Sequence, residues 1–405
     1  MSLKTATNAH YDRMKEDWQL ARDFFELSGL GRYLEQGKYE AEGPYRSRVG
    51  RRFAQDHTAT LVGRLADPML LRADEVERDL GPIPDDYLGS AGPGEESHDL
   101  QMHQLAEYLL VYGEAWVEVR PTGAGAELRI RTPLSVPRWT GNRVLTLGEA
   151  SRPDVPITQP EEVDTTYTVH SPRGFTTYMF RENETTGEEE RAQVDSGDYS
   201  PGEEEAFFVD AQGNPTAPLL RVEMPWDATF GVAVARVHRS IYRMRNQLHG
   251  RFGSILTNSR YYTKGLDADG EEKLVHALKR GRNLLHLDEN SEIGALEVPT
   301  DGIEEAQDEL RRLKDDLYRA ANQTIDGATS NASATEAVVK NEDKSAALAT
   351  LAATIESAEE SALRLIAQTQ NIVDYGGGST PPQDPGVASN WTDINWSQAS
   401  VDLGE

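Results

Sequence analysis

Residues 302–370 read GIEEAQDELRRLKDDLYRAANQTIDGATSNASATEAVVKNEDKSAALATLAATIESAEESALRLIAQTQ, and this stretch decides the fold that the sequence predicts. Two amphipathic helices are expected in it, over 303–322 and over 333–369. In the first helix, apolar residues recur three or four positions apart and charged residues fill the opposite face. The apolar positions are Ile303, Ala306, Leu310, Leu313, Leu317 and Ala321.

A polar segment of mostly small residues, Gln323–Ala332, separates the two expected helices. Ser333 and Glu336 form a capping box, which predicts that the second helix begins there. This helix would be roughly 50 Å long at about 1.5 Å per residue, and Gly376–Gly378 makes further extension unfavourable. The pattern by itself fits an ordinary helical hairpin with a loose tip.

Composition excludes several classes of protein. The chain has 405 residues, enough for two or more sub-domains, and no cysteine, which rules out a disulfide scaffold. Its net charge of −27 disfavours a monomer that grips nucleic acid tightly, but is compatible with a surface past which DNA slides. No run of eighteen apolar residues occurs, so we expect no membrane span.

Motifs of the common catalytic and metal-binding families are missing from the sequence. It contains no P-loop, no His-Glu-x-x-His and no Gly-x-Ser-x-Gly. The acidic run Asp267–Glu272 has the wrong spacing for an EF-hand. His57 is expected to pack in the core, and His98 and His103 are expected at surface or packing positions. We therefore expect no cofactor, no metal site and no enzymatic activity.

Periodicity along the rest of the chain predicts an α+β protein. Further helices are expected over 10–29, 45–65, 98–111, 231–257 and 269–281. Strands are expected over 115–119, 128–131, 144–147, 165–170, 176–181, 206–209, 219–223, 284–287 and 293–298. The strands before residue 224 would form a small, partly open barrel or sheet. Three further predictions are a solvated acidic hairpin tip over 182–205, a linker over 375–389 and a short strand over 391–396.

Five segments, in this order, resemble the portal proteins of tailed double-stranded DNA viruses. The resemblance as a whole spans Tyr11 to Leu365, nearly the whole chain, and the order of the segments is more specific than any single one. The segments are Tyr33-Leu34, Tyr45-Arg-Ser-Arg48, Thr60-Leu-Val-Gly-Arg-Leu-Ala-Asp-Pro68, Leu109-Leu-Val-Tyr-Gly-Glu-Ala-Trp-Val-Glu-Val119 and Ser333-Ala-Thr-Glu-Ala337.

The resemblance implies a head–tail connector in the virion, assembled in the host cytoplasm. About twelve copies would form a ring at one capsid vertex, with DNA packaged and ejected through its axis. The implied partners are further copies of the chain, double-stranded DNA, the terminase large subunit, the major capsid protein and a neck or adaptor protein. A membrane is not among them, and a separate terminase would supply the energy.

The portal resemblance also assigns parts to the chain. These are a wing over 1–230, stem and clip over 231–283, wing strands over 284–300, a wing helix and tunnel loop over 301–334, a long helix towards the crown over 335–370, and a linker with a short terminal segment over 371–405. The residues of the tunnel loop that would face DNA are Gln323, Thr324, Ile325, Asp326, Thr329, Ser330 and Asn331. Only 370–405 remain for a crown.

A basic stretch stands out in this acidic chain, since no acid occurs between Asp227 and Asp267. The basic stem and clip candidates in it are Arg236, Arg239, Arg243, Arg260 and Lys264. The first three share one helix face. Two interpretations stay open: salt bridges to an acidic neighbouring subunit, or contact with DNA phosphates or the terminase.

Two other classes of function remain as alternatives. One is a carboxylate-dependent hydrolase built on the β-rich middle, since Asp and Glu are abundant although no motif marks a pair. The other is a different virion structural or adaptor protein. The long helix pair disfavours a capsid-shell subunit.

Overall fold

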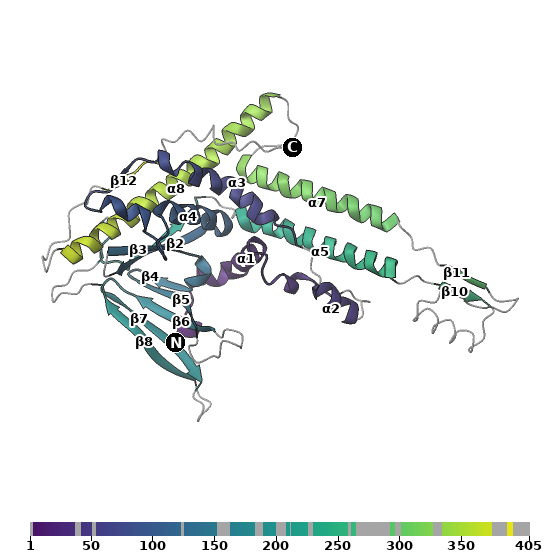
Figure 1. The fold of residues 1–405 in the computed structure, drawn as a ribbon, viewed down its shortest axis with the longest axis horizontal. Coiled ribbons are helices and arrows are strands. Elements are labelled where there is room, and N and C mark those ends of the chain that lie inside the picture. Colours follow the sequence, from purple (N-terminus) through teal and green to yellow (C-terminus); the bar gives the residue numbers. More distant parts are fainter. Residues whose placement is uncertain are drawn as a thin grey trace. The chain divides into compact units, whose positions relative to one another are not determined.

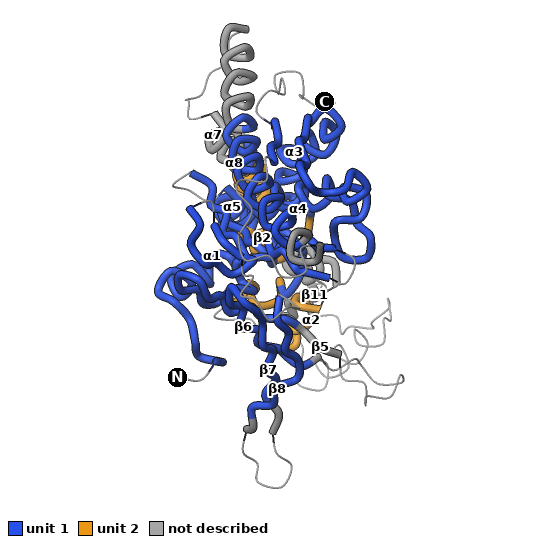
Figure 2. Tube along the Cα trace, turned by 90° about the vertical axis from the view of Figure 1, so that its left-hand side faces the viewer, with its two compact units in different colours: residues 1–29, 56–238, 317–405 blue, residues 30–55, 239–316 orange. Residues whose placement is uncertain are grey.

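The computed structural model describes residues 3–36, 42–50, 54–122, 125–151, 163–182, 189–199, 208–210, 212–225, 230–257, 261–264, 292–295, 301–326, 334–374 and 387–391. The chain divides into two compact units (Figure 2). The first contains 1–29, 56–238 and 317–405, and the second contains 30–55 and 239–316. Helices occur together with antiparallel sheets, which confirms the predicted α+β class (Figure 1).

Helix α1 (Ala9–Phe25) of the first unit is held by a cap at its N-terminus and by a hydrogen bond from a buried tryptophan in its middle. Its N-terminus is capped by Asn8, whose side chain accepts the backbone N–H of Tyr11 at 2.8 Å. The fully buried Trp18 donates its indole N–H to the carbonyl of Tyr112 at 3.0 Å. This bond ties α1 to the last residue of α4 (His98–Tyr112), so the two helices meet where α4 ends.

The turn after α4 depends on two glycines. Gly113 caps the helix in the left-handed conformation, with φ of 78°, and directs the chain into strand β2 (Glu114–Thr122). Gly231, at the start of α5 (Phe230–Thr257), packs against α4 so closely that a Cβ would lie 2.4 Å from the carbonyl oxygen of Val111. A glycine at this position therefore allows the start of α5 to pack directly against the end of α4.

Strand β2 is the centre of a three-stranded antiparallel sheet, between β3 (Gly125–Arg131) and β9 (Leu219–Glu223). Its first six residues are all buried, so buried and exposed side chains do not alternate along this part of the strand. Helix α4 and the 41-residue helix α8 (Ala334–Asp374) lie against β2 and β3 (Figure 1). The sheet is thus enclosed within the first unit.

A second, five-stranded sheet follows the order of the chain, β4 to β8, with every neighbour antiparallel. An apolar cluster of Trp116, Val136, Val144, Ala217 and Leu219 packs between it and the three-stranded sheet. The single barrel or sheet predicted from sequence is therefore two sheets. The five strands are β4 (Arg138–Thr140), β5 (Arg143–Ser151), β6 (Val163–His170), β7 (Gly174–Glu182) and β8 (Glu189–Asp198).

In the second unit, α2 (Glu42–Gly50) is held by polar contacts, with the Tyr45 hydroxyl donating to the carbonyl of Leu34 at 3.0 Å. Strands β10 (Tyr261–Lys264) and β11 (Glu292–Ala295) form an antiparallel pair. Helix α7 (Asp301–Asp326) begins in this unit and ends in the first. The short elements are η1 (Leu3–Thr5), η2 (Leu30–Tyr33), η3 (Ala73–Glu75), η4 (Asp85–Gly89), η5 (Pro133–Ser135), β1 (Arg78–Asp79) and β12 (Ala388–Ser389).

The single helix predicted over 45–65 is wrong. The structure has α2 followed by a separate α3 (His57–Leu71), with 54–56 non-helical between them. Asp56 precedes the first turn of α3, a position where an acidic residue favours a helix start. The helix also continues through Pro68 and ends three residues later at Leu71.

Two predictions for the β-rich region are also wrong. The segment 182–205 is not simply a hairpin tip, because β8 lies inside it and pairs with β7. Its side chains are mostly exposed, so no apolar alternation marks the strand. Of the strand expected over 206–209, the described residues make only one isolated bridge, Val209 with Pro215.

The C-terminal predictions need a correction too, since Trp391 lies outside any strand and β12 falls inside the expected linker. The helix expected over 269–281 and the strand over 284–287 lie outside the described residues. Among the helices that the structure describes, none combines the length and apolarity needed to cross a membrane.

Candidate functional site

The basic residues of α5 differ in their partners. Arg236 is exposed and donates to the carboxylate of Asp17 at 2.8 Å. Arg243 donates to the Glu35 carboxylate at 2.6 Å and to the carbonyl of Tyr33 at 2.8 Å. The sequence predicted partners on a neighbouring subunit, DNA or the terminase. The observed partners, Asp17 and Glu35, are instead acids of the same chain and lie far from α5 in the sequence. Such exposed pairs stabilise little and can exchange partners.

Arg239 lies between these two arginines along α5 and is half-buried. Within the described ranges it has no hydrogen bond or ion pair, and the Nη1 atom of Arg245 is likewise buried without a partner there. Lys264 stands opposite Glu292 in the β10–β11 register. Arg260 is outside the described residues. Arg239 is therefore the basic candidate with the most freedom to meet another molecule.

The predicted tunnel loop begins later than the sequence analysis expected. Gln323, Thr324, Ile325 and Asp326 form the last turn of α7, so the loop boundary at Gln323 is wrong. Ile325 follows Ala321 by four positions and continues the apolar stripe, and no residue before Gly327 breaks a helix. The other expected loop residues, Thr329, Ser330 and Asn331, lie outside the described part.

Both helices that border residues 327–333 are anchored in the first unit. Leu317 of α7 is fully buried. From Leu348 onwards, helix α8 contributes a row of buried small and aliphatic side chains to the core. These include Leu348, Leu351, Ala352, Ile355, Ala358, Ala362, Leu363, Leu365, Ile366 and Ala367. Burial on this scale fixes the position of α8 far more firmly than helix propensity does.

A buried ionic cluster holds α8 to its neighbours. Glu359 is 0% exposed, and its Oε1 accepts from Nε2 of His98 at 2.6 Å and from Nε of Arg78 at 2.8 Å. Its Oε2 accepts the indole N–H of Trp391. Arg78 also pairs with Asp99 at 2.8 Å. We call Arg78, His98, Glu359 and Trp391 the Glu359 cluster; it joins β1, α4, α8 and the C-terminal segment.

Burial by itself would raise the pKa of Glu359, but the hydrogen bond and charge of His98, the Arg78 guanidinium and the Trp391 N–H together lower it to about 2. Glu359 is therefore ionised at neutral pH and fully compensated. Sequence analysis placed His98 at a surface or packing position. Its packing role is confirmed, but its partner is 261 positions away and left no local signal.

A second buried network lies between the two sheets. Glu118 of β2 pairs with Arg131 and lies 3.9 Å from His170. His170 also contacts the Thr146 hydroxyl at 3.0 Å and the Tyr199 hydroxyl at 2.9 Å. Burial would raise the pKa of Glu118, yet the neighbouring positive charges lower it. Burial lowers the pKa of His170 to about 4, so its ring is neutral at pH 7.

The free energy of unfolding is expected to fall as the pH is lowered from 6.5 to 4. The unfolded chain binds a proton on His170 near its ordinary pKa of 6.5, whereas the folded chain does so only near 4, so acid favours unfolding. Between pH 7 and 4 the wild type should lose about 3 kcal/mol more than a His170→Gln variant, measured by urea unfolding. Glu359 contributes below this window, between 4.5 and about 2. Equal losses in both proteins would contradict this assignment.

One cluster has side chains of the kind that bind metals. Single ligand atoms of His10, Glu114 and Glu223 lie within 4.8 Å of one another. The guanidinium of Arg221 sits among them, however, pairing with Glu114 and, at 2.6 Å, with Glu223, and it stacks over Trp139 at 4.7 Å. A divalent ion would have to displace this resident cation, so the cluster is better understood as an ionic network.

Comparisons with known proteins give the following similarities. The family described as "Domain of unknown function (DUF4055)" matches residues 255–369. No curated protein matches the sequence. Among solved structures, the chain is similar to an HK97-family phage portal protein from Corynebacterium diphtheriae, with 13% identity, a TM-score of 0.33 and coverage of 76% of this chain and 87% of that one.

Two further similarities are to chains of gene transfer agent particles. A chain from the virion of the native particle shows 11% identity and a TM-score of 0.34 over 78% of this chain and 83% of that one. A chain from the neck of the native particle shows 13% identity and a TM-score of 0.31 over 84% and 85%.

Proposed function

We propose that this chain is the subunit of a portal, a ring at one vertex of a virion through which DNA is packaged and ejected. The observation that carries the proposal is the run of elements after Gly113. A sheet strand leads to a 28-residue helix, an antiparallel strand pair, a 26-residue helix and a 41-residue helix. The resemblance leads one to expect a stem helix, a clip, a second stem helix, wing strands and then two long helices on either side of a tunnel loop. The described elements follow this order, and the expected second stem helix, 269–281, lies outside the described residues.

The anchoring of α7 and α8 supports a role for residues 327–333 as a collar around DNA. The nearest buried residues on either side of this segment are Leu317 of α7 and Leu348 of α8, and both belong to the first unit. The residues of the segment, from Gly327 to Ser333, include no acid and no base, so they would neither grip phosphates nor repel them. In the ring this segment would line the narrowest part of the channel.

The charges suit a channel that does not bind its cargo. Exposed acids on α7 include Glu304, Glu305, Asp308 and Asp315, and Arg311 and Arg312 are paired with acids of the same helix at 2.9 and 2.8 Å. With a net charge of −27 per subunit, a ring would carry a strong negative field that keeps DNA centred and mobile. Tight phosphate binding would instead stall its movement.

We assign the remaining parts on the same basis. Residues 1–230 and 284–300 form the wing, 231–283 the stem and clip, and 335–370 the long helix. Arg239 is placed at a contact with a neighbouring subunit, the terminase or DNA. The major capsid protein and a neck or adaptor protein are the other partners. The protein acts through geometry and charge and catalyses no reaction.

Ring assembly is expected to become more stable as the salt concentration rises. Negative charge on every subunit opposes assembly most at about 0.01 M salt, where the Debye length is about 30 Å. Mass photometry should therefore find rings of about twelve 44.9 kDa subunits, near half a megadalton, that persist better in molar than in dilute salt. Monomers at every salt concentration would refute the proposal. Rings of equal stability in dilute and molar salt would refute only the electrostatic part.

A further inference from the structure

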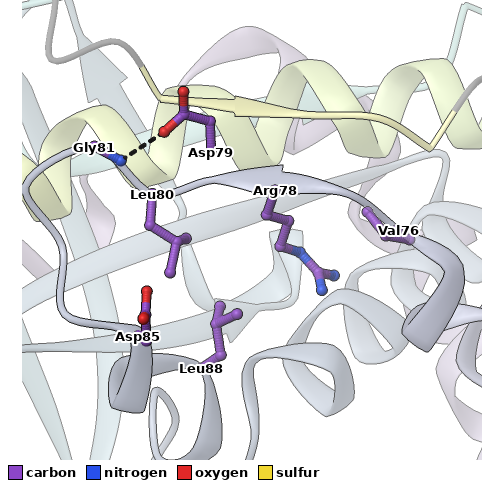
Figure 3. A pocket seen from close by; sticks show the side chains of 7 residues that line it. All are labelled: Val76, Arg78, Asp79, Leu80, Gly81, Asp85 and Leu88. Atoms are coloured by element: carbon purple, nitrogen blue, oxygen red, sulfur yellow. Dashed lines mark hydrogen bonds between the residues drawn. The ribbon is translucent and has the colours of Figure 1, made fainter.

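The C-terminal segment Val387–Trp391 returns to the core after a stretch rich in glycine and proline. Its strand β12 pairs antiparallel with β1, with Arg78 opposite Ser389 and Asp79 opposite Ala388. Figure 3 shows β12, in yellow, beside β1 and near helix α8. The face of β1 that carries Arg78 borders an open surface cavity of about 480 Å³. The segment thus adds one short strand to an edge near the surface.

Trp391 is the anchor of this segment. Its ring is 1% exposed, its N–H donates to Glu359, and the guanidinium of Arg78 lies 5.5 Å from the ring centroid. A large aromatic ring in a closed pocket with one hydrogen bond to a charged acceptor is the arrangement of a binding hot spot. The acceptor is already organised by His98 and Arg78, so the pocket requires little rearrangement to receive the ring.

Two other residues of the segment also lie in the first unit's interior. Val387 is buried, and the Ser389 hydroxyl reaches the carbonyl of Glu356 at 3.5 Å. The segment therefore combines a two-residue strand with one dominant side chain. This combination resembles peptide recognition by strand addition, where backbone pairing sets the register and one side chain gives most of the affinity. The preceding sequence includes Gly376–Gly378, Pro381 and Pro382, a composition typical of linkers.

We infer that Val387–Trp391 is a detachable latch, and that β1, α4 and α8 form a binding site for a tryptophan-bearing strand which the chain fills with its own C-terminal segment. A latch opens without unfolding the core. The Glu359 carboxylate keeps His98 and Arg78 when Trp391 leaves, so no charge is stranded. The occupied site joins the C-terminal segment to the middle of α8. The inference concerns a single chain and does not depend on ring assembly.

Hydrogen exchange of the full-length chain tests the latch. In Trp391→Ala, amides of 387–391 and of β1 should exchange at least about tenfold faster than in the wild type, while those of α4 and the second half of α8 keep their protection. Trp391→Phe, which loses the N–H but keeps a ring, should give a smaller acceleration. Glu360→Gln, one residue from Glu359, is the matched control and should change nothing.

A synthetic peptide distinguishes a binding site from a mere core segment. An excess of peptide 385–396, added to full-length Trp391→Ala, should restore the protection of the β1 amides, and the same peptide with alanine for Trp391 should not. Faster exchange throughout α4 and α8 in Trp391→Ala would show that the segment is part of the core and overturn the inference. Unchanged exchange at 387–391, or a native peptide without effect, would overturn it as well.

Discussion

Replacing Glu359 by alanine is expected to destabilise the first unit by about 3–5 kcal/mol, the cost of leaving a buried charge without its partner. The variant leaves the guanidinium of Arg78 with Asp99 alone, and it removes the acceptor of the buried His98 ring and of the Trp391 N–H. It also leaves a cavity beside Leu363 and Ile355, one turn away on α8. Urea unfolding followed by tryptophan fluorescence measures the loss.

Glu360→Ala is the control for this experiment. Glu360 lies on the same turn of α8, is half-buried and has no ion pair among the described residues. Its replacement should change the free energy of unfolding by no more than about 0.5 kcal/mol. Glu359→Gln keeps an acceptor for Trp391 and should lie between the two. Equal midpoints for Glu359→Ala and Glu360→Ala would show that the Glu359 cluster does not hold α8.

Deleting Thr329–Asn331 is expected to abolish or severely shorten the packaged genome while leaving the ring intact. The apolar contacts of α7 and α8 lie outside the deleted residues, so assembly should not depend on them. The proposed collar, in contrast, would lose its contact with DNA. Particle counts, ring images and the length of encapsidated DNA from virions carrying the deletion measure both outcomes.

A deletion of equal size between β7 and β8, Thr185–Gly187, is the matched control and should affect neither assembly nor packaging. If loop-deleted particles fill and retain a full genome, residues 327–333 are not a tunnel loop. If instead no ring forms, the segment lies at a subunit interface and its placement in the channel is wrong.

Long-period patterns could be predicted from sequence. The α5 prediction of 231–257 agrees with Phe230–Thr257, because apolar residues repeat over many turns and Thr257 ends the repeat. The strand at 219–223 is reproduced residue for residue. Both cases rest on local periodicity and on breakers such as Gly113.

Features set by tertiary contact could not be predicted. Strand β8 has a polar, exposed surface and exists because β7 offers an edge to pair with. Trp391 looked like part of a short terminal strand, and only the fold brings it to Glu359. The pairing of Arg236 with Asp17 joins residues 219 positions apart, which no motif signals. The basic residues were found from charge contrast, but their partners were not.

Imaging of the purified full-length chain tests the central claim most directly. The portal proposal predicts that single-particle class averages in molar salt show closed rings with an axial hole, viewed end-on, and a mass near half a megadalton from 44.9 kDa subunits. Residues 327–333 should border the hole at its narrowest point. A uniform population of compact monomers, folded and stable under the same conditions, would contradict the account.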